Sequence, residues 1–130
     1  MLRPLEMAHQ FLAEVITKED VVVDATMGNG HDTVFLAKLA GQVYAFDIQE
    51  QALANTQEKL DKLGLQHVQL ILDGHQHVDQ YVETLKAAIF NLGYLPSADK
   101  SVITLPATTI EAMEKICARL QKGGRMARMI

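Results

Sequence analysis

Short runs of apolar residues alternate along the chain with longer segments whose apolar residues recur at helical spacing. The short runs are typical of buried strands, and the longer segments are typical of amphipathic helices. This alternation predicts an α/β fold with a doubly wound, mostly parallel sheet. The predicted strands are 21–23, 43–46, 68–72, 87–90 and 125–130, and the predicted helices are 4–17, 32–40, 49–63, 76–86 and 108–120.

A polar residue follows each of the first four predicted strands, namely Asp24, Asp47, Asp73 and Asn91. Right-handed crossovers place the carboxyl ends of parallel strands along one edge of the sheet. Ligands bind at that edge in open α/β sheets. We therefore expect these four side chains, which are far apart in the sequence, to converge on one crevice.

The segment Asp24–Thr33 joins the first strand to the next helix and contains two glycines. Gly28 and Gly30 allow a tight turn and a close approach of the backbone to a ligand. A dinucleotide site favours a third glycine where this chain has Thr33, and the carboxylates of Asp24 and Asp32 would repel a pyrophosphate. The loop therefore favours a cationic ligand that bears an ammonium and a sulfonium group. The alternative is a plain turn in which Asp32 caps the helix.

Asp47 lies 17 residues after Gly30, at the end of the second predicted strand. An acidic residue at about this distance binds the two ribose hydroxyls of an adenosine cofactor. Two hydroxyls that face one carboxylate make charge-assisted hydrogen bonds. We therefore assign Asp47 to the ribose and the neighbouring Ile48 to the adenine face. The alternative for Asp47 is a residue of a surface turn.

The third predicted strand is followed by Asp73, Gly74 and His75. The Asp73 carboxylate can accept a hydrogen bond from the adenine amino group, and Gly74 leaves room for the base. His75 and His77 together could suggest a metal site. No third ligand at suitable spacing and no cysteine accompany them, so we expect no metal.

The fourth predicted strand is followed by Asn91, Leu92, Gly93 and Tyr94. An asparagine carbonyl and nearby backbone carbonyls can hold an attacking amine by its N–H groups, and Tyr94 can stack on a base. The stretch resembles the Asn-Pro-Pro-Tyr loop of methyltransferases that act on exocyclic amines. We therefore predict Asn91 and Tyr94 as catalytic residues. The alternative is an ordinary polar turn with Tyr94 in the core.

Three stretches, Asp24–Thr33, Phe46–Gln49 and Asn91–Pro96, resemble a bacterial family labelled "putative rRNA methylases". Members act as tRNA methyltransferases on the aminomethyl group of 5-aminomethyl-2-thiouridine at the wobble position. The resemblance covers essentially the whole chain. It implies a Rossmann-like class I methyltransferase fold, S-adenosylmethionine as cofactor, tRNA as partner and a cytoplasmic location. The predicted cofactor site comprises Asp24, Thr26, Gly28, Asn29, Gly30, Asp32, Thr33, Asp47, Ile48, Gln49, Asp73, Gly74, His75, Asn91 and Gly93.

Members of this family continue beyond the fifth strand with a loop, a helix and two more strands. We therefore expect a single domain, 1–130, that lacks the last strands of the fold. A sheet edge without its neighbours favours pairing with another chain, so we also expect a homodimer. Arg125 and Arg128 interrupt what should be a nearly continuous apolar strand.

Charge is unevenly distributed along the chain, whose formal net charge is −4. Residues 1–85 hold 5 Lys/Arg and 13 Asp/Glu, whereas residues 86–130 hold 7 Lys/Arg and 3 Asp/Glu. The basic part fits an anionic partner such as tRNA, and the alternative is a solvated helix face. The N-terminus lacks a long apolar core, so we expect no signal peptide, and we expect no membrane span, because no apolar run is long enough.

The single cysteine, Cys117, excludes an internal disulfide and fits a reducing cytoplasm. Methylation of a uracil ring carbon usually recruits a cysteine nucleophile, and Cys117 falls in a predicted helix away from the crevice. An amine is therefore the expected acceptor. The alternatives are methylation of rRNA or a small substrate and a cofactor-binding remnant without activity. A nucleotide-dependent oxidoreductase is disfavoured by Asp24 and Asp32.

Overall fold

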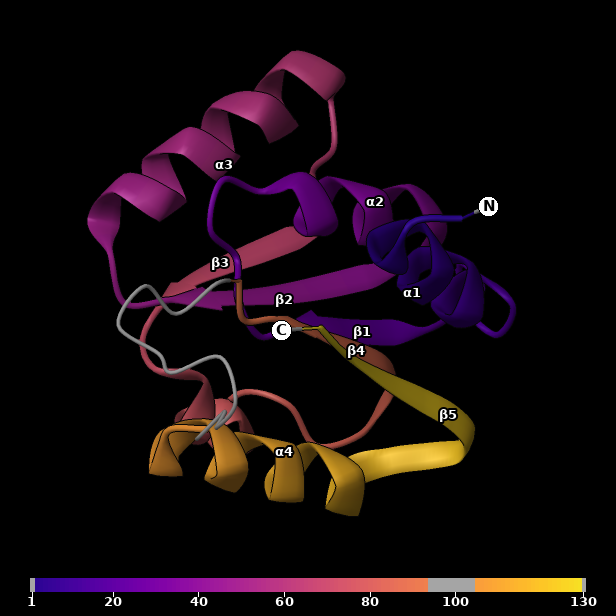
Figure 1. Cartoon of the computed structure of the whole chain (residues 1–130). Coiled ribbons are helices and arrows are strands. Elements are labelled where there is room, and N and C mark those ends of the chain that lie inside the picture. The colour runs from indigo at the N-terminus through magenta and orange to yellow at the C-terminus, as the bar shows by residue number, and fades with distance from the viewer. Residues whose placement is uncertain (1, 94–104, 130) are drawn as a thin grey trace.

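The computed structural model describes residues 2–93 and 105–129, and Figure 1 shows its ribbon. Strands and helices alternate along the chain. The strands are β1 (Val21–Asp24), β2 (Gln42–Asp47), β3 (Val68–Leu72), β4 (Leu85–Asn91) and β5 (Leu120–Met129). The helices are α1 (Pro4–Ala13), α2 (His31–Leu39), α3 (Glu50–Leu63) and α4 (Ala107–Arg119), with a 3-10 helix η1 (His75–Gln80).

The strands form one parallel sheet in the order β3-β2-β1-β4-β5. Helices α1, α2 and α3 lie on one face of this sheet, and η1 and α4 lie on the other (Figure 1). The strand order reverses direction at β1, which is the topological switch point of a doubly wound fold. The predicted α/β fold is confirmed.

The apolar run of β1 supplies residues to two separate cores. Val22 packs in a cluster with Leu12 of α1 and Leu36 of α2. Val23 packs in the other cluster, with Ile116 of α4. Successive side chains of a strand point to opposite faces, so a strand covered on both faces is apolar throughout rather than at alternate positions.

The carboxyl ends of the strands meet at one edge, as predicted. Asp24 is in register with Ile89 of β4, and Asp47 is in register with Leu72, the residue before Asp73. Asn91 ends β4, and the backbone N–H of Leu92 donates to the carbonyl of Met129. Four polar residues from distant parts of the chain are therefore brought to the same end of the sheet.

Two helices are shorter than the sequence pattern predicts. α1 ends at Ala13, and the N–H of Val15 already bonds three residues back to Leu12, which is a tightened last turn. The predicted helix 76–86 is instead the 3-10 helix η1, and β4 begins at Leu85. Short 3-10 helices serve as connectors, and here η1 joins β3 to β4.

The fifth strand starts earlier than predicted and is irregular. Gly123 and Gly124 lie inside β5, not in a turn before it, and the pairing of β4 with β5 shifts register between Leu85 and Ala87. Gly123 has φ +80°, and a Cβ on Gly124 would lie 2.7 Å from the carbonyl oxygen of Lys86. The two glycines therefore allow an irregularity within the strand, as in a β-bulge.

β5 lies at the edge of the described sheet and is not the buried apolar strand that we predicted. Its residues are mostly half-buried or exposed, with Ala127 buried. Arg125 donates to the carbonyl of Phe11, pairs with Glu14 and lies 4.5 Å above the Phe11 ring. An arginine in this strand therefore fastens α1 to β5 instead of disrupting a core.

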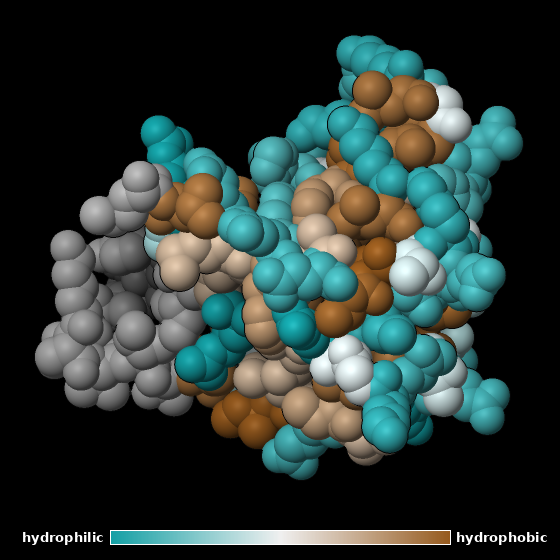
Figure 2. Space-filling model, turned by 90° about the vertical axis from the view of Figure 1, so that its right-hand side faces the viewer, coloured by the Kyte–Doolittle hydropathy of each residue, from teal (hydrophilic) through white to brown (hydrophobic). Residues whose placement is uncertain are grey.

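Hydrophilic residues occupy much of the face in Figure 2, with smaller hydrophobic areas between them. The exposed large hydrophobic residues of the molecule include Leu2, which precedes α1, and Met7 and Phe11, which lie on α1. None of the helices in residues 2–93 and 105–129 is long and apolar enough to cross a membrane.

Candidate functional site

A cavity of about 630 Å³ opens at the carboxyl ends of the strands, which is within the usual size of small-molecule sites. It lies between the loop after β1, the ends of β2, β3 and β4, and the start of α4. The lining residues are Ala25, Thr26, Gly28, Phe46, Asp47, Ile48, Asp73, Gly74, His75, Gln76, Asn91, Leu92 and Thr108. Eight of them were predicted as site residues, namely Thr26, Gly28, Asp47, Ile48, Asp73, Gly74, His75 and Asn91.

Asp24 precedes the lining residue Ala25, does not itself line the cavity and is fully buried. Its carboxylate accepts hydrogen bonds from the backbone N–H of Thr26 (3.0 Å) and the hydroxyl of Thr33 (2.7 Å). Asp24 thereby ties together the two ends of the loop between β1 and α2. Burial raises its pKa to about 7, and the Asp32 carboxylate adds to the rise, whereas the Thr33 hydrogen bond opposes it. Contact between Asp24 and a cofactor stays a prediction.

Asp47 lines the cavity and holds the glycine loop. One carboxylate oxygen accepts from the N–H of Gly28 (3.0 Å) and the other accepts from the N–H of Gln49 (3.0 Å). A carboxylate oxygen accepts more than one hydrogen bond, so these contacts leave capacity for two ligand hydroxyls. Ile48 is 74% exposed on the cavity wall. An exposed apolar residue beside a carboxylate fits a ligand with a flat apolar part and adjacent hydroxyls.

The other end of the glycine loop faces α3. Asn29 bonds to Asn55 through its side chain and to Lys59 through its carbonyl. Gly30 has φ +90°, and a Cβ there would lie 2.7 Å from the Thr56 hydroxyl oxygen. The close packing of the loop against α3 therefore explains why position 30 is a glycine, whereas we had expected that a nearby ligand requires it. Contacts of Asn29, Gly30 and Gln49 with a cofactor stay predictions.

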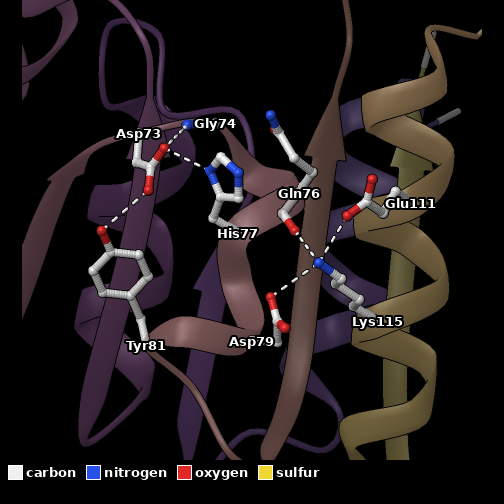
Figure 3. Close-up of polar contacts among 8 residues, drawn as sticks. All are labelled: Asp73, Gly74, Gln76, His77, Asp79, Tyr81, Glu111 and Lys115. Atoms are coloured by element: carbon white, nitrogen blue, oxygen red, sulfur yellow. Dashed lines mark hydrogen bonds and ion pairs between the residues drawn. The ribbon is translucent and has the colours of Figure 1, made fainter.

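The Asp73 carboxylate is bonded on both oxygens to its own neighbourhood (Figure 3). It accepts from the N–H of Gly74 (2.8 Å), the ring of His77 (2.7 Å) and the hydroxyl of Tyr81 (3.1 Å). The His77 hydrogen bond is the main reason that the pKa of Asp73 lies below its usual value. Asp73 therefore fixes η1 against the end of β3 while it lines the cavity.

His75 forms part of the cavity wall and is held at both ring nitrogens. Nδ1 lies 2.8 Å from the carbonyl oxygen of Ala25, which can only accept, so Nδ1 donates. Nε2 lies 3.2 Å from the hydroxyl of Thr109. These contacts disfavour His75 as the base that receives a substrate proton. Among the described residues, no three His, Cys, Asp or Glu side chains are grouped to hold a metal.

Lys115 of α4 is a supporting residue that the sequence did not reveal. Its ammonium donates to the carbonyl of Gln76 (2.7 Å) and pairs with Asp79 (3.0 Å) and Glu111 (2.8 Å), as Figure 3 shows. The Glu111 hydrogen bond is the main cause of the raised pKa of Lys115. This lysine fixes η1, which carries the lining residues His75 and Gln76, onto α4.

Asn91, at the end of β4, lines the same cavity as the residues after β2. Its backbone N–H donates to the Thr26 hydroxyl (2.7 Å), and its side-chain Nδ2 donates to Asp32 (3.3 Å). Asp32 is almost fully buried and also contacts His9 of α1. Contacts of Asp32, Thr33 and Gly93 with a cofactor stay predictions. The predicted catalytic residue Tyr94 lies outside the described residues.

His9, Lys115, Thr108 and Thr109 were missed by the sequence reasoning. All four lie on helices, at positions where the local pattern indicates only a helix face. Thr108 and Thr109 stand two and three residues after Pro106, which caps α4. The start of a helix that follows a strand end is the one local signal that could have pointed to them.

The family model described as "Putative rRNA methylase" matches residues 43–130. A curated relative from Arabidopsis thaliana, "tRNA (mnm(5)s(2)U34)-methyltransferase, chloroplastic", is 36% identical over 140 residues, which cover 96% of this chain and 51% of that protein. The chain thus spans about half the length of this curated relative.

Two solved structures are more similar. A protein from Streptococcus mutans described as "a putative methyltransferase", solved in complex with S-adenosylhomocysteine, is 60% identical, with a TM-score of 0.89, over 98% of this chain and 72% of that one. An rRNA methylase from Streptococcus thermophilus is 54% identical, with a TM-score of 0.88, over 98% and 71% of the two chains. The chain therefore belongs to the family described as "Putative rRNA methylase", a family of S-adenosylmethionine-dependent methyltransferases with the Rossmann-like class I fold.

Proposed function

We propose that this protein binds S-adenosylmethionine in the cavity and methylates the aminomethyl nitrogen of 5-aminomethyl-2-thiouridine at the wobble position of tRNA. The observation that carries the proposal is that Asp47 and Asn91 stand on the walls of one cavity. One supplies a carboxylate for the cofactor, and the other supplies an amide for the acceptor. The curated relative named as a tRNA methyltransferase supports the choice of substrate.

The residues present fit the cofactor. Asp47 offers carboxylate oxygens to the two ribose hydroxyls, and Ile48 offers an exposed apolar surface to the adenine. The start of α2 does not suit a pyrophosphate, because Asp32 stands in its first turn and Asp24 lies buried beneath the loop. When bound, S-adenosylmethionine supplies an electrophilic methyl group carried on a sulfonium.

The protein contributes mainly position. Asn91 can accept an N–H of the attacking amine and so aim its lone pair at the methyl group, and such orientation can supply roughly 7–11 kcal/mol. The amine needs no activation by a nucleophile. Cys117, the single cysteine, is exposed on α4 and does not line the cavity. A covalent route to a ring carbon therefore has no thiol near the cavity.

A basic surface for RNA is smaller than the sequence suggested. Lys115 and Arg125 are paired with acidic side chains. Arg128 is exposed on β5 in register with Phe90, one residue before Asn91. We therefore propose Arg128 as a phosphate contact beside the acceptor end of the cavity. A cytoplasmic location, where tRNA is modified, is part of the same proposal.

The test incubates the protein with labelled S-adenosylmethionine and three RNAs: tRNA that carries 5-aminomethyl-2-thiouridine, tRNA that lacks the aminomethyl group, and ribosomal RNA. The proposal expects label on the first RNA alone, on the side-chain nitrogen after digestion to nucleosides. Label on a ring carbon, on both tRNAs equally, or on ribosomal RNA alone would overturn it. Binding of S-adenosylhomocysteine without any labelled RNA would favour a cofactor-binding remnant.

Arg128→Ala tests the RNA surface, with Lys38→Ala as its control. Lys38 is exposed near the end of α2, at the other end of the sheet. Loss of one phosphate contact should weaken tRNA binding and reduce its dependence on salt. We expect Arg128→Ala to lower affinity several-fold at 50 mM salt and Lys38→Ala to leave it unchanged. Equal effects would remove Arg128 from the interface.

A further inference from the structure

A partly buried chain of three polar side chains runs from α1 to the cavity wall. His9 Nε2 of α1 lies 2.7 Å from one carboxylate oxygen of Asp32, at the start of α2. The other oxygen of Asp32 accepts from Nδ2 of Asn91 at 3.3 Å. Asp32, the middle member, is 4% exposed, whereas His9 and Asn91 are half-buried. The outer end of the chain is a helix with no residue on the cavity wall.

The imidazole of His9 is held firmly in place. It stacks on the ring of Phe35, with centroids 3.7 Å apart and planes 4° apart, and on the ring of His31 at 5.7 Å. Phe35 and His31 both belong to α2, the helix that carries Asp32. The stacking therefore fixes the direction from which Nε2 meets the carboxylate.

The fixed position of the Asp32 carboxylate determines the orientation of the Asn91 side-chain amide. Its Nδ2 donates to Asp32, which leaves Oδ1 as the amide atom that can accept from a ligand in the cavity. A rotated amide would place Oδ1 against the Asp32 carboxylate, where two acceptors repel each other. The position of the carboxylate thus decides which end of the amide is presented to the substrate.

We propose that His9 and Asp32 are positioning residues that orient Asn91 for an acceptor with an N–H donor. This inference rests on the proposed function and deepens it, since it explains why the site selects an amine. His9 fixes Asp32, Asp32 fixes the amide, and neither touches the substrate. It also assigns Asp32 a role other than the direct cofactor contact that the sequence suggested.

The first test needs no turnover. His9→Phe keeps the aromatic stack on Phe35 and removes the nitrogen that meets Asp32. In the cofactor-free protein, the side-chain amide resonances of Asn91, assigned by their loss in Asn91→Ala, should shift in His9→Phe. The control is His67→Phe, because His67 contacts the carbonyl of Ala37 near the other end of α2. Asn91 resonances that stay in place in His9→Phe would overturn the proposal, whether or not the protein methylates tRNA.

The second test separates positioning from cofactor binding. Asp32→Asn and His9→Phe should leave the affinity for S-adenosylhomocysteine within about twofold and lower kcat on the order of 10–100-fold, the usual effect of a misplaced reacting group. Weaker S-adenosylhomocysteine binding with unchanged kcat would show that Asp32 contacts the cofactor instead. If His9→Phe does not fold, the Asn91 side-chain amide resonances are measured in Asp32→Asn instead. A shift of these resonances would support the orienting role of Asp32, and resonances that stay in place would overturn it.

The third test asks whether the residues act through Asn91. In an Asn91→Ala background, His9→Phe should have no further effect on kcat, because residues that act as a unit are not additive. A structural role in docking α1 would instead lower kcat by the same factor in both backgrounds. Equal factors would therefore overturn the proposal. If no tRNA is methylated at all, the proposed function fails while the resonance test still decides the orientation of Asn91.

Discussion

The pKa of Asp24 makes the stability of the protein depend on pH in an unusual direction. Asp24 is fully buried, and its pKa is raised from 3.8 to about 7, mainly by burial. The folded state therefore binds the proton more tightly than the unfolded chain does. The contribution of Asp24 is fully present below pH 3.8 and is lost as the pH rises through about 7. Between these values the free energy of unfolding should fall by about 1.4 kcal/mol per pH unit.

The whole effect amounts to roughly 4 kcal/mol, a large part of the stability of a small domain. Asp24→Asn removes the charge and keeps an oxygen that can accept from Thr26 or Thr33. We expect the variant to match or fall slightly below the wild type only near or below pH 3.8. At pH 5 Asp24 is protonated in the folded state but ionised in the unfolded chain, so the wild type has already lost roughly 1–2 kcal/mol. At pH 8 the variant should be the more stable protein by a few kcal/mol.

The assay is urea unfolding of wild type and Asp24→Asn, without cofactor, at half-unit steps from pH 5 to pH 8.5. The difference between the two proteins isolates Asp24, because other titrating groups are shared. Asp79→Asn is the control, since its Lys115 hydrogen bond lowers the pKa of Asp79 and places its titration below this range. A difference between wild type and Asp24→Asn that stays constant over the range would refute the reasoning.

Three further predictions test the cofactor loop and the sheet edge. Asp47→Ala should weaken S-adenosylhomocysteine binding by on the order of 2–4 kcal/mol in calorimetry, and the control Asp61→Ala on α3 should leave binding unchanged. If Asp47→Ala and the wild type bind with equal affinity, Asp47 is not part of the site. Gly30→Ala should destabilise the fold by about 1–3 kcal/mol more than Gly64→Ala in urea unfolding. Both glycines have positive φ, but only a Cβ on Gly30 would meet Thr56. Equal losses of unfolding free energy in the two variants would contradict the packing role of Gly30. The outer edge of β5 should pair with a second copy, and a clean monomer in sedimentation at high micromolar concentration would exclude this.

The framework of the site could be predicted because it depends on local chemistry. Each strand end is marked by a switch from apolar to polar residues, as at Asp24, Asp47 and Asn91, and parallel connection then brings the ends together. The glycine loop and Asp47 follow one another at a spacing that a helix and a strand impose. The local sequence pattern was therefore enough to predict the position of the cavity and most of its lining residues.

The irregular features were harder to predict, since they depend on pairing between distant segments. Gly123 and Gly124 indicate a turn when taken alone, and become an irregularity within β5 because β4 lies against them. Arg125 indicates a break in an apolar strand, and becomes a link to α1 because Phe11 and Glu14 lie beside it. Neither neighbour can be inferred from the residues on either side of these positions.

The buried carboxylates show the same limit in the chemistry of the site. In the sequence, Asp24 and Asp32 both indicated negative charge for a cationic ligand. In the structure, Asp24 is bonded to Thr26 and Thr33, and Asp32 is bonded to His9 and Asn91. A carboxylate that faces a ligand and one that faces protein donors have the same local sequence pattern. Which of the two a given aspartate becomes depends on the segments that pack against it in the folded protein. Because α1 delivers His9 to Asp32, a helix outside the cavity helps to determine what the cavity accepts, and substitutions in α1 should change turnover before they change cofactor affinity.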